Sequence, residues 1–183
     1  MSRKYKFHDK EGIYFVSFAT VYWIDLFVRE VYFSIVTEAM QYHVREKGME
    51  LFCWCIMPSH VHMIFRDQKN KHPELLLGGL KSYTSRMLQK EIALHPTESR
   101  REWMQWMMQR AGDKTSNVNG SMLWQHHNKP IELWSGEVMK QKLDYTHLNP
   151  VVAGFVTEPE HWKYSSAVDY AGGKGLVDVT LIC

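Results

Sequence analysis

Two apolar segments separated by only two residues constrain the fold of this chain most strongly. Residues 49–57, MELFCWCIM, and residues 60–65, HVHMIF, flank the turn-forming pair Pro58-Ser59. Both segments are rich in residues that favour strands, and a connection this short joins antiparallel strands. The sequence therefore predicts a buried β-hairpin over residues 49–65.

The remaining segments extend this hairpin into a complete sheet. Residues 12–23 are a predicted strand, residues 29–48 and 73–94 have the apolar spacing of helices, and residues 122–134 look like an interrupted strand. Strand, helix, strand, strand, helix, strand is the order of the split βαβ arrangement. We therefore predict an α+β, ferredoxin-like fold, with one antiparallel sheet and helices on one face.

Length and composition indicate a single domain, 1–183. The chain has 183 residues, of which 45% are hydrophobic and 23% charged, as is usual for globular proteins. We expect a helical insertion at 95–121, an added helix at 135–149 with Ser135 as its N-cap, and a short tail after 170. No apolar run approaches the roughly 18 residues of a membrane span, and no signal peptide is recognisable. The sequence predicts a cytoplasmic protein with no membrane partner.

Basic and aromatic residues occur together in the insertion, and a basic arm begins the chain. The arm contains Arg3, Lys4 and Lys6, and arginines flank Trp103 and Trp106 of the insertion. Such a combination suits a nucleic-acid surface, where tryptophans stack on unpaired bases. It equally suits an amphipathic helix whose tryptophans pack onto the domain. The net charge of +2 does not decide between these two interpretations.

His60 and His62 are two residues apart in the second strand of the hairpin. Because strand side chains alternate between faces, the two imidazoles point to the same side, with Cβ atoms roughly 6.5–7 Å apart. Neutral imidazoles that converge in this way can bind a divalent metal. Two histidines on a sheet face also occur without a metal, so a metal site requires a third ligand and a reacting group.

A structural zinc site is an alternative within the same hairpin. If the turn contains two residues, Cys55 lies opposite His62. Cys53, Cys55, His60 and His62 would then form a tetrahedral set of ligands. Four ligands on one hairpin face crowd each other, and a buried cysteine commonly acts as a small hydrophobic side chain.

The predicted helix 135–149 supplies both missing parts. Tyr145 and Asn149 are four residues apart and share a helix face, whereas His147 points to the other side. A free phenol, with a pKa of about 10, is a poor nucleophile at neutral pH, and a cation held nearby would assist its attack on a phosphate. Tyr145 is thus a candidate nucleophile, or else a packing residue, and Asn149 a candidate ligand. Pro150 is expected to end the helix.

These two segments together resemble the single-tyrosine HUH transposases. MPSHVHMIF, residues 57–65, is similar to the histidine–hydrophobic–histidine metal motif of that family. LDYTHLNPVVAGFVTEPEHWKYSSAVDY, residues 143–170, closely resembles the C-terminal signature of the REP-associated tyrosine transposases. The two signatures occur in the order of the family, and the resemblance covers roughly residues 12–170.

The resemblance implies a DNA transposase that acts on single-stranded DNA, often beside a hairpin. His60, His62 and Asn149 would bind Mg²⁺ or Mn²⁺, and Tyr145 would attack a DNA phosphate, giving a 5′-phosphotyrosine link and a free 3′-OH. Transposases of this type act as homodimers or as monomers, and both states remain open. The alternative function is a non-cleaving, regulatory DNA-binding descendant of such an enzyme.

Overall fold

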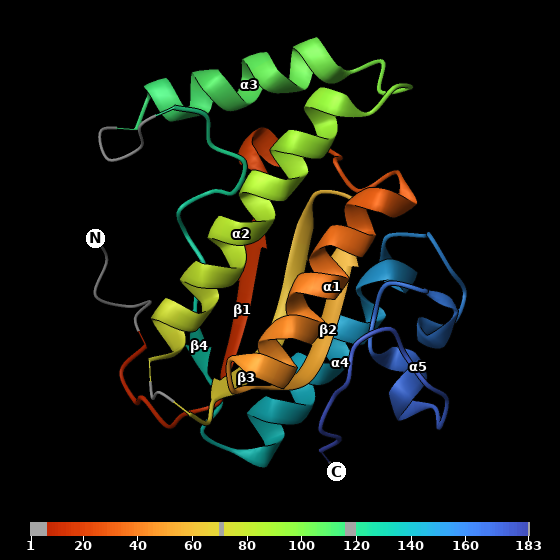
Figure 1. Ribbon diagram of the computed structural model, residues 1–183. Helices are drawn as coiled ribbons and strands as arrows, with labels where there is room; N and C mark the ends of the chain where they lie inside the picture. The colour runs from red at the N-terminus through yellow and green to blue at the C-terminus, as the bar shows by residue number, and fades with distance from the viewer. Residues whose placement is uncertain (1–6, 70–71, 116–119, 183) are drawn as a thin grey trace.

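Four strands form one antiparallel sheet in the computed structural model, which describes residues 7–69, 72–115 and 120–182. The strands are β1 (Tyr14–Ala19), β2 (Met49–Met57), β3 (His60–Asp67) and β4 (Ile131–Glu132), in the spatial order β2-β3-β1-β4 (Figure 1). Because β3 separates β1 from β2, the topology is the split βαβ arrangement. The predicted α+β fold is confirmed. The basic arm, Arg3, Lys4 and Lys6, lies outside the described residues.

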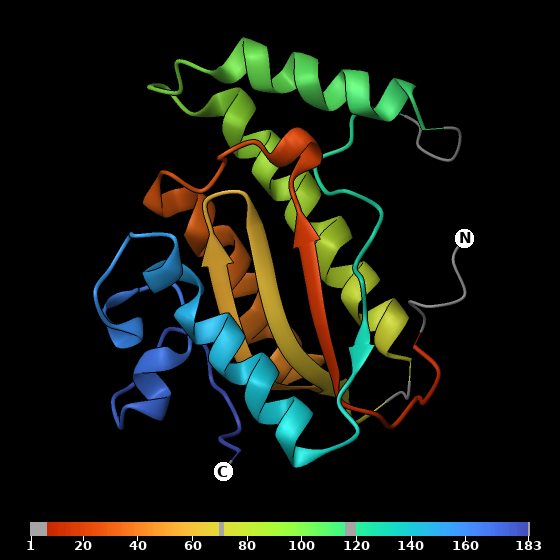
Figure 2. The same cartoon turned by 180° about the vertical axis from the view of Figure 1, so that it is seen from behind.

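Helices cover both faces of the sheet. Helices α1 (Glu30–Glu46) and α2 (Pro73–Leu94) lie side by side on one face, and α4 (Gly136–Val152) crosses the opposite face (Figure 2). Helix α3 (Arg101–Asp113) lies across the end of α2, and the C-terminal segment contains the short α5 (Ala167–Tyr170). No helix in the described part of the chain is both long and apolar enough to cross a membrane.

The alternation of side chains along the strands divides the core into two layers. Val61 and Met63 of β3 belong to the large cluster beneath α1 and α2. Phe15, Cys53 and Ile64 belong to a smaller cluster beneath α4. Burial of each large apolar side chain contributes roughly 1.5–3 kcal/mol. The sheet is therefore fixed from both sides, and its α4 face is a rigid base for polar side chains.

Two predicted strands are shorter in the structure. The predicted strand 12–23 ends at Ala19, and Val21–Trp23 form the 3₁₀ turn η1, in which Tyr22 and Trp23 have positive φ angles of 55° and 57°. The predicted strand 122–134 is reduced to β4 and an isolated bridge between Thr20 and Trp124. The apolar and aromatic residues of both segments favour strands, but in each the chain turns away from the edge of the sheet.

Helix α4 continues through Pro150, so the prediction that Pro150 ends it is wrong. Ser135 caps its first turn as predicted, by accepting a hydrogen bond from the Val138 N–H. At the other end Gly154, with a φ of 77°, donates its N–H to Val151 O, and Phe155 donates to Pro150 O. This pair of bonds is a Schellman motif. The turn that contains Asn149 is therefore inside a well-closed helix end.

The C-terminal segment covers the open edge of β2. Its backbone bonds join Ile56 N–H to Tyr164 O at 2.9 Å and Ser166 N–H to Trp54 O at 3.0 Å. Further along, Thr180 N–H donates to Leu51 O at 2.8 Å. The unpaired backbone groups of an exposed edge strand can form hydrogen bonds with a strand of another chain. The segment thus protects the sheet and brings Ser166 beneath α4.

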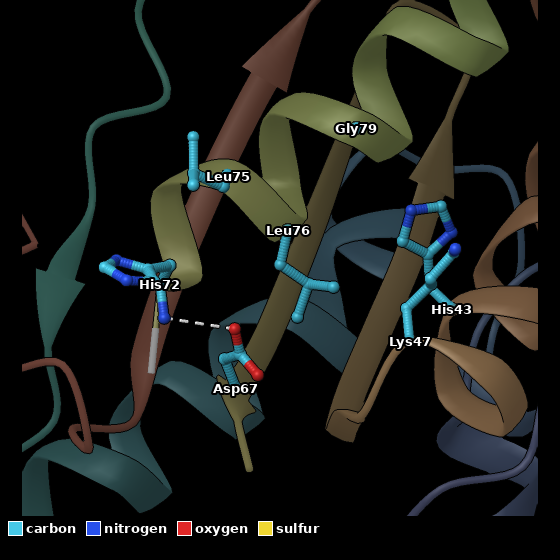
Figure 3. A pocket seen from close by; sticks show the side chains of 7 residues that line it. All are labelled: His43, Lys47, Asp67, His72, Leu75, Leu76 and Gly79. Atoms are coloured by element: carbon cyan, nitrogen blue, oxygen red, sulfur yellow. Dashed lines mark hydrogen bonds between the residues drawn. The ribbon is translucent and has the colours of Figure 1, made fainter. Parts of the chain in front are cut away.

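A pocket of about 310 Å³ lies between α1 and α2. His43 of α1 and Lys47, directly after that helix, border it on one side, and Gly79 of α2 borders it on the other (Figure 3). Asp67, at the end of β3, accepts a hydrogen bond from the His72 backbone N–H at 3.1 Å and so fixes the start of α2. The pocket is on the face opposite α4, and it is separate from the site described next.

Candidate active site

His60 and His62 lie at the start of β3, with ring centroids 4.7 Å apart. His62 pairs across the sheet with Ser17 of β1 and with Cys55 of β2, so the predicted position of Cys55 opposite His62 is confirmed. His62 is only 3% exposed, whereas His60 is partly exposed beside the hairpin turn. The strand period therefore places both imidazoles together, as predicted.

Helix α4 brings Tyr145 and Asn149 to this pair. The Tyr145 ring lies edge-on to His62, with centroids 5.2 Å apart. The Asn149 side-chain nitrogen lies 3.2 Å from His62 Nε2. Because the two residues are one helical turn apart, a single helix face presents both of them to the sheet. Tyr145 is 49% exposed, so its hydroxyl is open to a substrate from solvent.

Phe15 and Lys142 complete the site, and neither was identified from the sequence. The Phe15 ring stacks on His62 with centroids 5.5 Å apart and meets Tyr145 edge-on at 5.9 Å. Lys142 Nζ lies 5.1 Å from the centre of the Phe15 ring and 5.4 Å from that of Tyr145. Lys142 precedes Tyr145 by three residues, a helical spacing that could have indicated it. The site thus holds an apolar floor and a cation next to the phenol.

Burial keeps both histidines neutral. Burial first, and then the nearby His60 and Lys142, together lower the pKa of His62 to about 3. Burial also lowers the pKa of His60, although the Asp25 carboxylate opposes this effect. Neutral imidazole is the form that binds metals.

The donor set fits a divalent metal ion. His62 Nε2 faces helix α4, because it lies 3.2 Å from the Asn149 side-chain nitrogen. A half-turn of the Asn149 amide would present its oxygen, in place of its nitrogen, to the same space that Nε2 faces. Two neutral imidazoles and an amide oxygen are ligands that first-row divalent metals accept.

The zinc alternative is not supported by the positions of the cysteines. The described residues include no cluster of three or more His, Cys, Asp or Glu side chains suited to a metal. The proposed zinc ligands, Cys53, Cys55, His60 and His62, therefore do not form such a group. Cys53 Sγ instead lies 3.2 Å from His147 Nε2. Burial raises the pKa of Cys53 to about 12, so its thiol is neutral.

Trp103 and Trp106 are on α3. Both are roughly half exposed, and α3 instead packs through Met104, Met108 and Ala111. The packing of α3 thus depends mainly on these apolar side chains, and the interpretation that the tryptophans pack the insertion onto the domain is not supported. Arg110 lies over the Trp106 ring, with its guanidinium carbon 5.2 Å from the ring centre.

Comparison with known proteins agrees with this fold. One solved structure, a REP-associated tyrosine transposase bound to a REP hairpin, superposes with a TM-score of 0.64, at 18% identity, over 98% of this chain and 94% of that chain. At this identity the likeness shows a shared fold. No curated protein sequence matches the chain. The family model described as "Transposase IS200 like" matches residues 13–119, more than half of the chain, including the histidine pair. The chain belongs to the IS200-like transposase family.

Proposed function

We propose that this chain nicks and rejoins single-stranded DNA through covalent attack by Tyr145. The observation that carries this proposal is the meeting of α4 with β3. The ring centroids of Tyr145 and His62 are 5.2 Å apart, and the Asn149 side-chain nitrogen lies 3.2 Å from His62 Nε2. An exposed phenol beside two neutral imidazoles and an amide is a suitable arrangement for metal-assisted phosphoryl transfer.

His60, His62 and Asn149 would hold the metal ion, Mg²⁺ or Mn²⁺. The bound ion would polarise the scissile phosphate and stabilise charge that develops in the transition state. The chain itself prepares the site: burial keeps the imidazoles neutral, and the Phe15 ring stacked on His62 fixes the orientation of that ligand. The closed end of α4 holds Asn149 one turn after Tyr145.

The reaction exchanges one phosphoester bond for another. The Tyr145 hydroxyl oxygen would bond to phosphorus and lose its proton, and the bond from phosphorus to the 3′ oxygen would break, with that oxygen taking up a proton. The products are a 5′-phosphotyrosine and a free 3′-OH. Because the number of phosphoester bonds is unchanged, another 3′-OH can reverse the step without ATP. Lys142, next to the phenol, would offset negative charge on the attacking oxygen.

The proposed substrate is single-stranded DNA beside a hairpin. The family assignment supports DNA as the substrate. The solved transposase with the same fold is bound to a REP hairpin. We propose that this chain likewise binds a hairpin and cuts an unpaired segment next to it, as a monomer or a homodimer.

A covalent-adduct assay tests the proposal. Single-stranded oligonucleotides that contain the hairpins flanking the gene are labelled at the 3′ end and incubated with protein and Mn²⁺ or Mg²⁺. We expect a labelled protein band on a denaturing gel that requires metal and disappears in Tyr145→Phe. Tyr42→Phe is the matched control, because Tyr42 is equally exposed but on α1, and it should retain the band. Hairpin binding without any adduct would contradict cleavage and favour the non-cleaving DNA-binding alternative.

A further inference from the structure

We infer that Trp23 is a stacking platform for an unpaired nucleobase next to the phosphate that Tyr145 attacks. The inference deepens the proposed function and rests on it. It assigns a role to η1, the turn that replaces the end of the predicted first strand.

The backbone of η1 is strained at two consecutive aromatic residues. Tyr22 and Trp23 have φ angles of 55° and 57°, in the left-handed region that bulky residues avoid. Such a conformation costs on the order of 1–3 kcal/mol per residue and is concentrated at binding and catalytic sites. Burial of the two aromatic side chains does not fully offset this strain, because Tyr22 is 43% and Trp23 55% exposed.

The surrounding chain holds the strained turn in place. The Thr20 hydroxyl donates to Ile24 O at 2.8 Å and contacts Ser59 O at 3.1 Å. Val21 N–H donates to Leu123 O at 2.8 Å, and Val21 and Ile24 are buried. These contacts tie η1 to the hairpin turn that precedes His60. The backbone that carries the two exposed rings is therefore held in place relative to the start of β3.

Trp23 is directly beside the proposed metal ligands. Its ring meets the His60 ring edge-on, with centroids 5.5 Å apart. His60 is in turn 4.7 Å from His62, and His62 is 5.2 Å from Tyr145 between ring centroids. These rings form a continuous row from Trp23 to the nucleophile. A single DNA strand whose scissile phosphate lies at Tyr145 and His60 would have a neighbouring nucleotide within reach of Trp23.

The chemistry of the position favours a base over a phosphate. An exposed indole face stacks on any nucleobase, and this stacking does not require a particular sequence. The exposed Asp25, two residues further along, places a carboxylate on the segment directly after η1. A carboxylate repels a phosphate but accepts hydrogen bonds from base amino groups. The nucleotide at Trp23 is therefore expected to place its base, and not its phosphate, against the protein.

A double-mutant cycle tests the inference in the non-cleaving Tyr145→Phe background. Dissociation constants are measured for a hairpin oligonucleotide and for versions with one abasic site at each position next to the mapped cut. Trp23→Ala should weaken binding to the complete oligonucleotide on the order of 5- to 100-fold. It should have little further effect where the stacked base is already missing. Trp23→Phe should restore most of the loss.

Two further variants separate stacking from folding. Trp134→Ala is the matched control: Trp134 is 78% exposed and follows β4, which pairs with the opposite end of β1 from η1, and its loss should not change binding. Trp23→Gly removes the ring and also relieves the positive φ. It should raise the melting temperature slightly while it weakens binding as much as Trp23→Ala does.

The outcomes distinguish this inference from the proposed function. If Trp23→Ala binds within twofold of the parent, or weakens binding equally at every abasic position, the stacking role is overturned, and adduct formation by the parent still supports the proposed function. If the wild type forms no adduct with any oligonucleotide, the proposed function fails. In that case abasic sites are placed at every position of the oligonucleotide that binds best. The stacking role then requires one position at which Trp23→Ala has little further effect on the dissociation constant.

Discussion

The rings of His62 and Tyr145 meet edge to face, with centroids 5.2 Å apart and an angle of 72° between their planes. One ring comes from the middle of the sheet and the other from the helix that crosses it, and Phe15 contacts both. A proposed metal ligand and the proposed nucleophile are therefore in direct contact. Substitutions around this contact should affect cleavage and DNA binding to different extents.

His60→Ala should abolish adduct formation and leave hairpin binding within about threefold of wild type. The substitution removes one proposed metal ligand, whereas affinity depends chiefly on phosphate and base contacts elsewhere. The two quantities are measured by the labelled-adduct assay and by gel shift on the same oligonucleotide. Cleavage at close to the wild-type rate in the same metal would show that the metal assignment is wrong.

Lys142→Gln should slow adduct formation on the order of 10- to 100-fold, because it removes the cation next to the developing charge. Lys140→Gln is the control. Lys140 is on the same helix, but it is largely exposed and pairs with Asp144 at 2.7 Å. Single-turnover adduct rates at saturating DNA separate this effect from weaker binding. Equal rates for the two variants would exclude a role of Lys142 in the chemical step.

His147→Ala should destabilise the fold by about 2–4 kcal/mol. The imidazole is buried, and it contacts Ser166 Oγ at 2.8 Å and Cys53 Sγ at 3.2 Å, so that it joins α4 to β2 and the C-terminal segment. Its removal leaves a cavity and takes one buried hydrogen-bonding contact from Cys53 and one from Ser166, which keeps its bonds to the Trp54 backbone. Urea unfolding measures the loss, with Tyr145→Phe as a control that should change stability little. A loss below about 0.5 kcal/mol would contradict this structural role.

The central parts of the fold and site could be predicted because they depend on local periodicity. The two-residue turn determined the hairpin, the strand period placed His60 and His62 on one face, and the helical period placed Tyr145 with Asn149. Each of these relationships involves positions only a few residues apart. Regular backbone geometry alone fixes them.

The rest of the site depends on contacts between distant segments. Phe15 reaches His62 through the register of β1 on β3, and His147 meets Ser166 only because the C-terminal segment returns along β2. The positive φ angles of η1 contradict the strand preference of its aromatic residues. Local preference also indicated that Pro150 would end α4, but hydrogen bonds beyond the proline close the helix. Tertiary contacts decided each of these features.

A buried carboxylate, Glu98, should make the fold sensitive to acid. Its side chain is completely buried, and burial alone would raise its pKa. Hydrogen bonds from Arg100, Arg29 and Tyr32 together outweigh burial and lower the pKa from 4.5 to about 2. A carboxyl with a lowered pKa in the folded state stabilises the fold above its ordinary pKa. That contribution is lost as the pH falls from about 4.5 towards 2.

The Glu98 contribution can be isolated by comparing wild type with Glu98→Gln across this range. At pH 7 the variant should be less stable by roughly 3 kcal/mol, the value that corresponds to the lowered pKa. The difference in unfolding free energy should shrink as the pH falls to 3, because the carboxyl of the unfolded chain, with its ordinary pKa of 4.5, then takes up a proton, whereas the folded carboxyl stays largely ionised. Glu30→Gln is the control, since the exposed Glu30 pairs with Lys163 at the surface and should contribute little at either pH. Urea unfolding at pH 7 and pH 3 gives both differences. An equal Glu98→Gln difference at the two values would show that ionisation of this carboxyl does not stabilise the fold.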